Sequence, residues 1–99
     1  MSNGKLVRDR IPEIIRKQGG EPRVRKLDEE SFREALCDKL GEETKEFLEG
    51  RTVEELADIL EVVYALAGDV GLTQDALEAI RLKKRAERGG FDQRLILEA

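Results

Sequence analysis

Between residues 28 and 90 the sequence is divided into three helix-like segments, and this division constrains the fold more than any other feature. Each segment opens near a residue that caps helices well and closes with glycine. Apolar residues recur within the segments at the three- and four-residue spacing of a buried helical face. We therefore predict helices from about Asp28 to Gly50, from Thr52 or Val53 to about Val70, and from Thr73 to Arg88.

The flanking segments predict shorter or less regular structure. The stretch "IPEIIRKQGG" predicts a short helix, because Pro12 suits a first turn and a glycine pair follows. The stretch "EPRVRKLD" alternates enough to be extended, and the tail "FDQRLILEA" contains an apolar run that would be a strand or a docking segment. Together these elements predict one all-α domain over residues 1–99, an antiparallel bundle of three main helices with a short N-terminal helix.

Large apolar side chains are few for such a bundle. Only 39% of the residues are hydrophobic and 4% are aromatic. A chain of 99 residues is also near the lower end of what buries a good core alone. We therefore expect the core to be completed by oligomerisation, as a homodimer or a dimer of dimers.

Charge and composition exclude several classes of protein. The net charge is −4, whereas a dedicated nucleic-acid binder usually has a basic excess, so no nucleic-acid partner is expected. The absence of His excludes His-based catalysis and His-ligated zinc. The single Cys37 fits a reducing cytosol. The most apolar stretch, residues 53–72, carries five acidic residues and cannot be a membrane span, and no signal-peptide run precedes it. We expect a cytoplasmic protein.

The long predicted helix carries carboxylates on its apolar face. Measured from Leu36 at 100° per residue, Glu43 lies about 20° away, inside the apolar stripe, and Glu46 about 80° away at its edge. Glu42 lies further round on the same side as Glu46. Lys39 is the obvious cation of that face, about 60° from Leu36. The spacing therefore predicts that Glu43 points into the core and that Glu46 stands beside it, one turn along.

The next predicted helix has a second carboxylate pair. Measured from Ile59, Glu55 lies about 40° from the centre of the stripe and Asp58 about 100° away on the same side, whereas Glu61 points the opposite way. Ionised carboxylates in an apolar bundle cost several kcal/mol each unless charge compensates them. One or two divalent cations would provide that charge, and oxygen ligands favour Mg²⁺ or Mn²⁺. A solvated acidic surface with i, i+4 ion pairs is the alternative interpretation of the same residues.

These acidic motifs resemble those of a known family. "EETKE" followed by "EELAD" is similar to the EExxE and ExxD motifs of the MazG-like, all-α nucleoside triphosphate pyrophosphohydrolases. Their superfamily includes the phosphoribosyl-ATP pyrophosphohydrolases and the dimeric dUTPases. "KLVRDRIPEII" and "KKRAERGGF" resemble the flanking motifs of a small single-domain branch. The link between Glu46 and Glu55 is eight residues long, shorter than in many members, and leaves little room for a substrate-specificity loop.

The resemblance implies Mg²⁺-dependent hydrolysis of a nucleoside triphosphate between the α and β phosphates, giving a monophosphate and pyrophosphate. Mn²⁺ would be a possible substitute. By the same resemblance, the metal ligands would be Glu43, Glu46, Glu55 and Asp58. Glu42 would be a further ligand or would orient the attacking water. Candidates for substrate binding are Lys5, Arg8, Asp9, Lys39, Lys84, Arg88 and Phe91.

Other interpretations of these residues stay open. Lys84 and Arg88 would also suit the dipole at a helix C-terminus, and Phe91 could instead fill the core. The protein could be a phosphoribosyl-ATP pyrophosphohydrolase of histidine biosynthesis, which hydrolyses the same α–β phosphate bond in another nucleotide. It could also be a non-catalytic helical dimer that binds a nucleotide or a protein. A nucleic-acid binder using "EPRVRK" is disfavoured by the net charge. Base and sugar preference, a role in clearing damaged nucleotides or in controlling pools, and the number of metals per site are not determined by these motifs.

Overall fold

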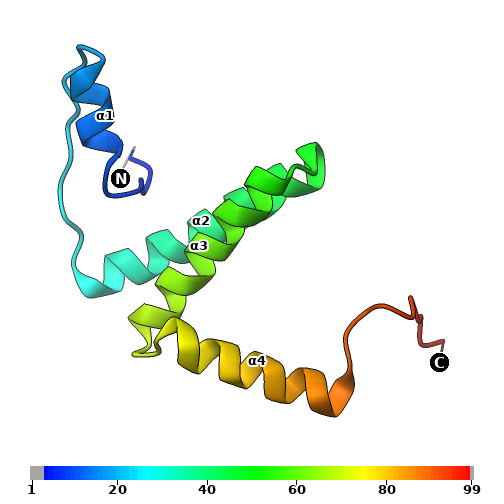
Figure 1. The fold of residues 1–99 in the computed structure, drawn as a ribbon. Helices are drawn as coiled ribbons and strands as arrows, with labels where there is room; N and C mark the ends of the chain where they lie inside the picture. The colour runs from blue at the N-terminus through cyan, green and yellow to red at the C-terminus, as the bar shows by residue number, and fades with distance from the viewer. Residues whose placement is uncertain (1–3, 99) are drawn as a thin grey trace.

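The computed structural model describes residues 4–98, and these residues form an all-helical chain (Figure 1). The helices are α1 (Ile11–Lys17), α2 (Glu29–Gly50), α3 (Val53–Asp69) and α4 (Gln74–Arg88). The described residues contain no β-strand. The predicted all-α class is confirmed, and the three main helices begin and end close to their predicted boundaries.

Local hydrogen bonds explain why the helices begin where they do. The Asp28 carboxylate accepts the backbone N–H of Ser31 at 2.8 Å, and this bond lowers the pKa of Asp28. The hydroxyl groups of Thr52 and Thr73 cap α3 and α4 in the same way. These side chains satisfy backbone N–H groups that have no partner inside the helix.

The end of α2 differs from the prediction in one respect. Gly50 is still helical, and Arg51 takes the left-handed conformation with φ 55°. The N–H of Arg51 donates to the carbonyl of Phe47 at 2.7 Å and closes the last turn. The left-handed residue that reverses the chain is therefore an arginine rather than the expected glycine.

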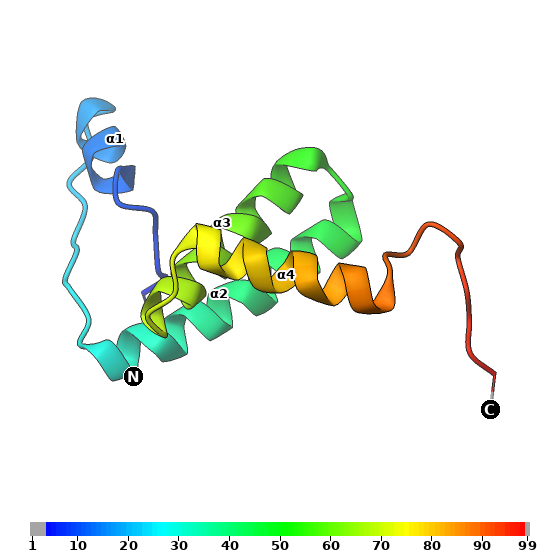
Figure 2. The same ribbon diagram turned by 60° about the horizontal axis from the view of Figure 1, so that its bottom comes forward.

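Helices α2 and α3 pack side by side as an antiparallel hairpin, joined by a link of two residues (Figures 1 and 2). The buried apolar side chains lie in this hairpin: Leu36, Val62 and Ala67. Arg33 of α2 donates to Asp69 of α3 at 2.7 Å, near the open end of the hairpin. The Asp69 side chain is almost fully buried, so this ion pair fixes how the two helices are aligned.

Helix α4 does not complete a bundle within one chain. It contacts α3 but not α2, and Figure 1 shows it diverging from the hairpin. Its apolar residues are sparse, and Ile80 is 47% exposed. The closed antiparallel bundle predicted from the sequence is therefore not found in the described residues of the single chain.

The single chain exposes much more surface than a compact protein of its mass. Its accessible surface is 9067 Å², whereas a folded monomer of 11.2 kDa has roughly 5,700 Å². Its radius of gyration is 17.2 Å, compared with about 12.6 Å for a compact domain of this length. Many large apolar side chains on α3, α4 and the tail are exposed, among them Val53, Leu56, Leu60, Ile80 and Leu97.

The C-terminal tail forms neither the predicted strand nor a docked segment. Phe91 begins a turn closed by the N–H of Arg94, and residues 95–98 run on without helix or strand. Phe91 is 96% exposed, so it does not fill the core of the single chain. In residues 4–98, no helix combines the length and apolar content that crossing a bilayer requires.

Candidate functional site

Glu43 is a buried carboxylate in the helical hairpin. It lies in the middle of α2 and is only 7% exposed, as the apolar periodicity predicts. One of its oxygens, Oε1, lies 3.3 Å from Nζ of Lys39, one turn earlier on the same helix. The other oxygen, Oε2, is buried without a hydrogen-bond partner. A buried carboxylate oxygen without a partner is costly, so this atom points to a ligand or a functional role.

Glu46 lies one turn further along α2 and is exposed. The negative charge of Glu43 raises the pKa of Glu46, and the ammonium of Lys39 opposes this effect. The two carboxylates therefore repel each other when both are ionised. Repulsion of this kind is relieved by a proton or by a bound cation.

We expect Glu46→Gln to stabilise the metal-free protein at neutral pH. Because the folded state holds the Glu46 proton more tightly than the unfolded state, stability falls as pH rises from the ordinary value of 4.5 through the raised pKa of the folded protein. Glu46→Gln does not lose stability in this way. Its free energy of unfolding should therefore exceed that of wild type at pH 8, and the difference should be smaller at pH 4. Urea unfolding with chelator present measures the free energy of unfolding of both proteins at pH 8 and at pH 4.

The control for this comparison is Glu34→Gln, which removes the same charge from an exposed position of α2. It should leave the pH dependence close to that of wild type. If the stability gained by Glu46→Gln grew as the pH fell, the assigned repulsion between Glu43 and Glu46 would be contradicted.

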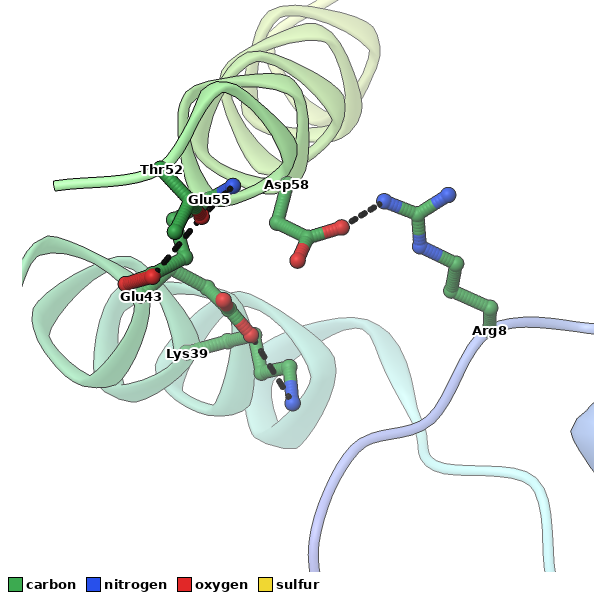
Figure 3. A network of polar contacts seen from close by, with 6 residues as sticks. All are labelled: Arg8, Lys39, Glu43, Thr52, Glu55 and Asp58. Atoms are coloured by element: carbon green, nitrogen blue, oxygen red, sulfur yellow. Dashed lines mark hydrogen bonds and ion pairs between the residues drawn. The ribbon is translucent and has the colours of Figure 1, made fainter. Parts of the chain in front are cut away.

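Glu55 and Asp58 lie on α3, and each has a partner (Figure 3). Oε1 of Glu55 accepts the Thr52 hydroxyl at 2.8 Å, while the Glu55 backbone N–H donates to the same hydroxyl oxygen. Asp58 accepts a 2.6 Å hydrogen bond from the guanidinium of Arg8. Gly50 leaves room for the Glu55 carboxylate, since a Cβ at position 50 would lie 3.0 Å from Oε2 of Glu55. The Glu55 carboxylate thus accepts a hydrogen bond from the hydroxyl that caps α3.

Residues 4–9, called the leading segment below, lie against the helical hairpin. Lys5 Nζ lies 3.3 Å from Oε1 of Glu42 on α2, and Arg8 reaches Asp58 on α3. The leading segment therefore places two cations of the predicted substrate site beside two of the predicted acidic residues.

A cavity of about 400 Å³ lies between the leading segment and the two helices. Its charged side chains include Arg8, Lys39, Glu43 and Asp58, of which Figure 3 shows the arrangement. Its apolar wall includes Leu6, Phe32, Leu36, Val62 and Ala65. The cavity thus combines a charged region with an apolar one, as ligand sites commonly do.

The four predicted metal ligands lie as two pairs. Glu43 and Asp58 line the cavity, whereas Glu46 and Glu55 line a separate open hollow near the turn of the hairpin. Among residues 4–98, no three acidic or thiol side chains lie close enough to hold a metal ion. In this arrangement Glu55 is hydrogen-bonded to Thr52 and Asp58 to Arg8.

The remaining predicted residues divide between the cavity and α4. Asp9 lines the cavity. Lys84, Arg88 and Phe91 are exposed on α4 and in the tail, and α4 does not contact α2. A single chain therefore does not bring these three residues to the buried Glu43.

Two site features were missed from the sequence. Glu61 lines the cavity, although its helical angle placed it on the opposite side of α3. The angle is measured from Ile59, at the centre of the apolar stripe, whereas the leading segment lies against another part of α3. The second feature is the hydrogen bond between Thr52 and Glu55, which the spacing T-x-x-E of a capping box could have indicated.

Comparison with known proteins adds little to this geometry. No model of a protein family matches the sequence, and no solved structure matches it. Among curated proteins, an uncharacterized protein of Mycolicibacterium smegmatis (strain ATCC 700084 / mc(2)155) is 51% identical over 41 residues. The match spans 41% of this chain and 42% of that protein.

Proposed function

We propose that the protein is a Mg²⁺-dependent nucleoside triphosphate pyrophosphohydrolase that cleaves between the α and β phosphates. The observation that carries this proposal is Glu43, a buried carboxylate with one oxygen unpartnered, beside a cavity that Asp58 also lines. The acidic motifs and flanking motifs of the MazG-like enzymes point to the same reaction.

Glu43 and Asp58 line the cavity and offer the one or two carboxylates through which Mg²⁺ is commonly held together with substrate phosphates. Lys39 compensates one oxygen of Glu43, and the raised pKa of Glu46 reflects negative charge that remains uncompensated. Hard oxygen ligands favour Mg²⁺, with Mn²⁺ as a substitute. By the resemblance, the residues that would hold it are Glu43, Glu46, Glu55 and Asp58, of which Glu43 and Asp58 line the cavity and Glu46 and Glu55 the hollow at the turn. When bound, such an ion neutralises phosphate charge and lowers the pKa of water.

The other residues of the cavity have separate roles in this proposal. Lys39, Lys5 and Arg8 would bind phosphate oxygens, Arg8 by paired N–H donors and the lysines as point charges. Glu42 would orient the attacking water or serve as a further ligand. The apolar wall around Phe32 and Val62 would receive the uncharged part of the nucleotide.

The proposed enzyme works as a homodimer or a dimer of dimers in the cytoplasm. The surface excess over a compact monomer, roughly 3,000 Å², exceeds the roughly 1,000–2,500 Å² that each subunit of an obligate dimer buries. The exposed apolar residues of α3 and α4 would form the interface, and a partner subunit would supply Lys84, Arg88 and Phe91 to the cavity. Sedimentation equilibrium of the full chain tests this, and a monomer at micromolar concentration would contradict it.

The reaction is tested by measuring pyrophosphate release from a panel of ribo- and deoxyribonucleoside triphosphates with Mg²⁺, with Mn²⁺ and with chelator. Metal-dependent release of pyrophosphate together with a monophosphate is the expected result. Release of orthophosphate would contradict the proposed bond, and no hydrolysis of any triphosphate would contradict the proposed substrate class. Including phosphoribosyl-ATP in the panel distinguishes the histidine-biosynthesis alternative.

A further inference from the structure

The leading segment contacts the acidic residues through charged side chains. Arg8 Nη2 lies 2.6 Å from Oδ1 of Asp58, a residue 50 positions later in the chain, and Lys5 pairs with Glu42 at 3.3 Å. Residues 4–8 have no helix or strand of their own. The side chains of Lys5 and Arg8 are 73% and 56% exposed, so solvent can replace these contacts at low cost.

The Asp58 carboxylate binds a divalent cation less favourably while it is paired with Arg8. The guanidinium occupies only Oδ1 of the carboxylate, but it places a positive charge next to the position that a second positive ion would take, and the two cations repel each other there. Glu43 differs, because its Oε2 is buried and accepts no hydrogen bond. A cation that enters at Glu43 would therefore meet Arg8 at Asp58.

We propose that Arg8 is an internal counter-ion of Asp58, which a divalent cation displaces, and that the released arginine then binds the phosphates of the substrate. This inference rests on the proposed function, since it takes the cation site from it. In the metal-free protein, Arg8 reduces the repulsion among the acidic residues and holds the leading segment against the hairpin. Metal binding exchanges this contact for a ligand bond and leaves Arg8 next to the cavity with its donors free.

The exchange links metal binding to substrate binding. Because Arg8 opposes the metal before substrate is present and holds phosphate afterwards, each ligand should raise the affinity for the other. Arg8 is a positioning and substrate-binding residue in this scheme, and it takes no part in bond cleavage.

The test is calorimetric titration of the full chain with Mn²⁺ in the absence of nucleotide. The variant is Arg8→Gln, and the matched control is Arg10→Gln, which removes the same charge two residues away, where Arg10 pairs with Glu13 instead. Arg8→Gln should bind Mn²⁺ more tightly than wild type by about twofold to fivefold, the range that corresponds to an exposed ion pair. Arg10→Gln should bind Mn²⁺ as wild type does.

A second titration, with a non-hydrolysable α,β-methylene nucleoside triphosphate and saturating Mn²⁺, should show the opposite order. Here Arg8→Gln should bind the nucleotide analogue more weakly than wild type does, because a contact with its phosphates is lost. Equal Mn²⁺ affinity of wild type and Arg8→Gln would overturn the counter-ion role and leave the proposed function standing. If wild type, Arg8→Gln and Arg10→Gln all failed to bind Mn²⁺, both the counter-ion role and the proposed function would be overturned. Circular dichroism checks that the variants keep their helices.

Discussion

Glu43→Gln is expected to abolish metal-dependent hydrolysis of nucleoside triphosphates, a loss of roughly 10³-fold or more. The substitution keeps the shape of the side chain and removes the buried charge that would hold the cation. Several kcal/mol of charge stabilisation by a metal correspond to a loss of this size. Pyrophosphate release under saturating Mg²⁺ measures it.

The same variant should remain folded. The neutral amide at position 43 would no longer repel Glu46, although the ion pair with Lys39 would also be lost. We expect the melting temperature of the variant with chelator to equal or exceed that of wild type. Glu34→Gln, on an exposed position of the same helix, is the matched control and should keep wild-type turnover. Wild-type turnover of Glu43→Gln would exclude Glu43 as a metal ligand.

Leu36→Ala is expected to destabilise the chain by about 3 kcal/mol. Leu36 is 3% exposed and is one of the few large apolar side chains buried between α2 and α3. It also borders the cavity, so its truncation enlarges a space that is already present. Because small domains have about 5–15 kcal/mol of stability in total, the loss is a large part of what holds the hairpin together. Urea unfolding followed by circular dichroism measures it.

Leu82→Ala provides the comparison for this prediction. Leu82 is 50% exposed on α4, where truncation should cost less than about 1 kcal/mol. Equal destabilisation by the two variants would mean that the hairpin core is not the main source of stability, and that contacts of α4 with a partner subunit matter as much.

The local structure of the chain follows from residues close together in sequence. Asp28, Thr52 and Thr73 each bond to a backbone N–H three residues later, so the helix starts could be predicted from the sequence. The burial of Glu43 could be predicted for the same reason, since its angle to Leu36 depends only on helical geometry. The positions of the four carboxylates on their helices therefore follow from the sequence.

The grouping of these carboxylates depends on contacts between distant segments. The sequence predicts four acids around one site, whereas the structure divides them into the pair at the cavity and the pair at the turn. The pairing of Asp58 with Arg8 joins residues 50 positions apart, and no periodicity within a helix contains that information. The same holds for Glu61, whose place in the cavity depends on where the leading segment lies.

Capping bonds and helical periodicity act over three or four residues, so the helices, their boundaries and the burial of Glu43 could be derived from the amino-acid order alone. Three further features emerged only in the folded chain: α4 diverges from the hairpin, the tail is exposed, and the leading segment pairs with Glu42 and Asp58. These features depend on which apolar contacts and ion pairs form between residues far apart in the chain, and on which do not. Such contacts are weak individually, and they are established only when the whole chain has folded.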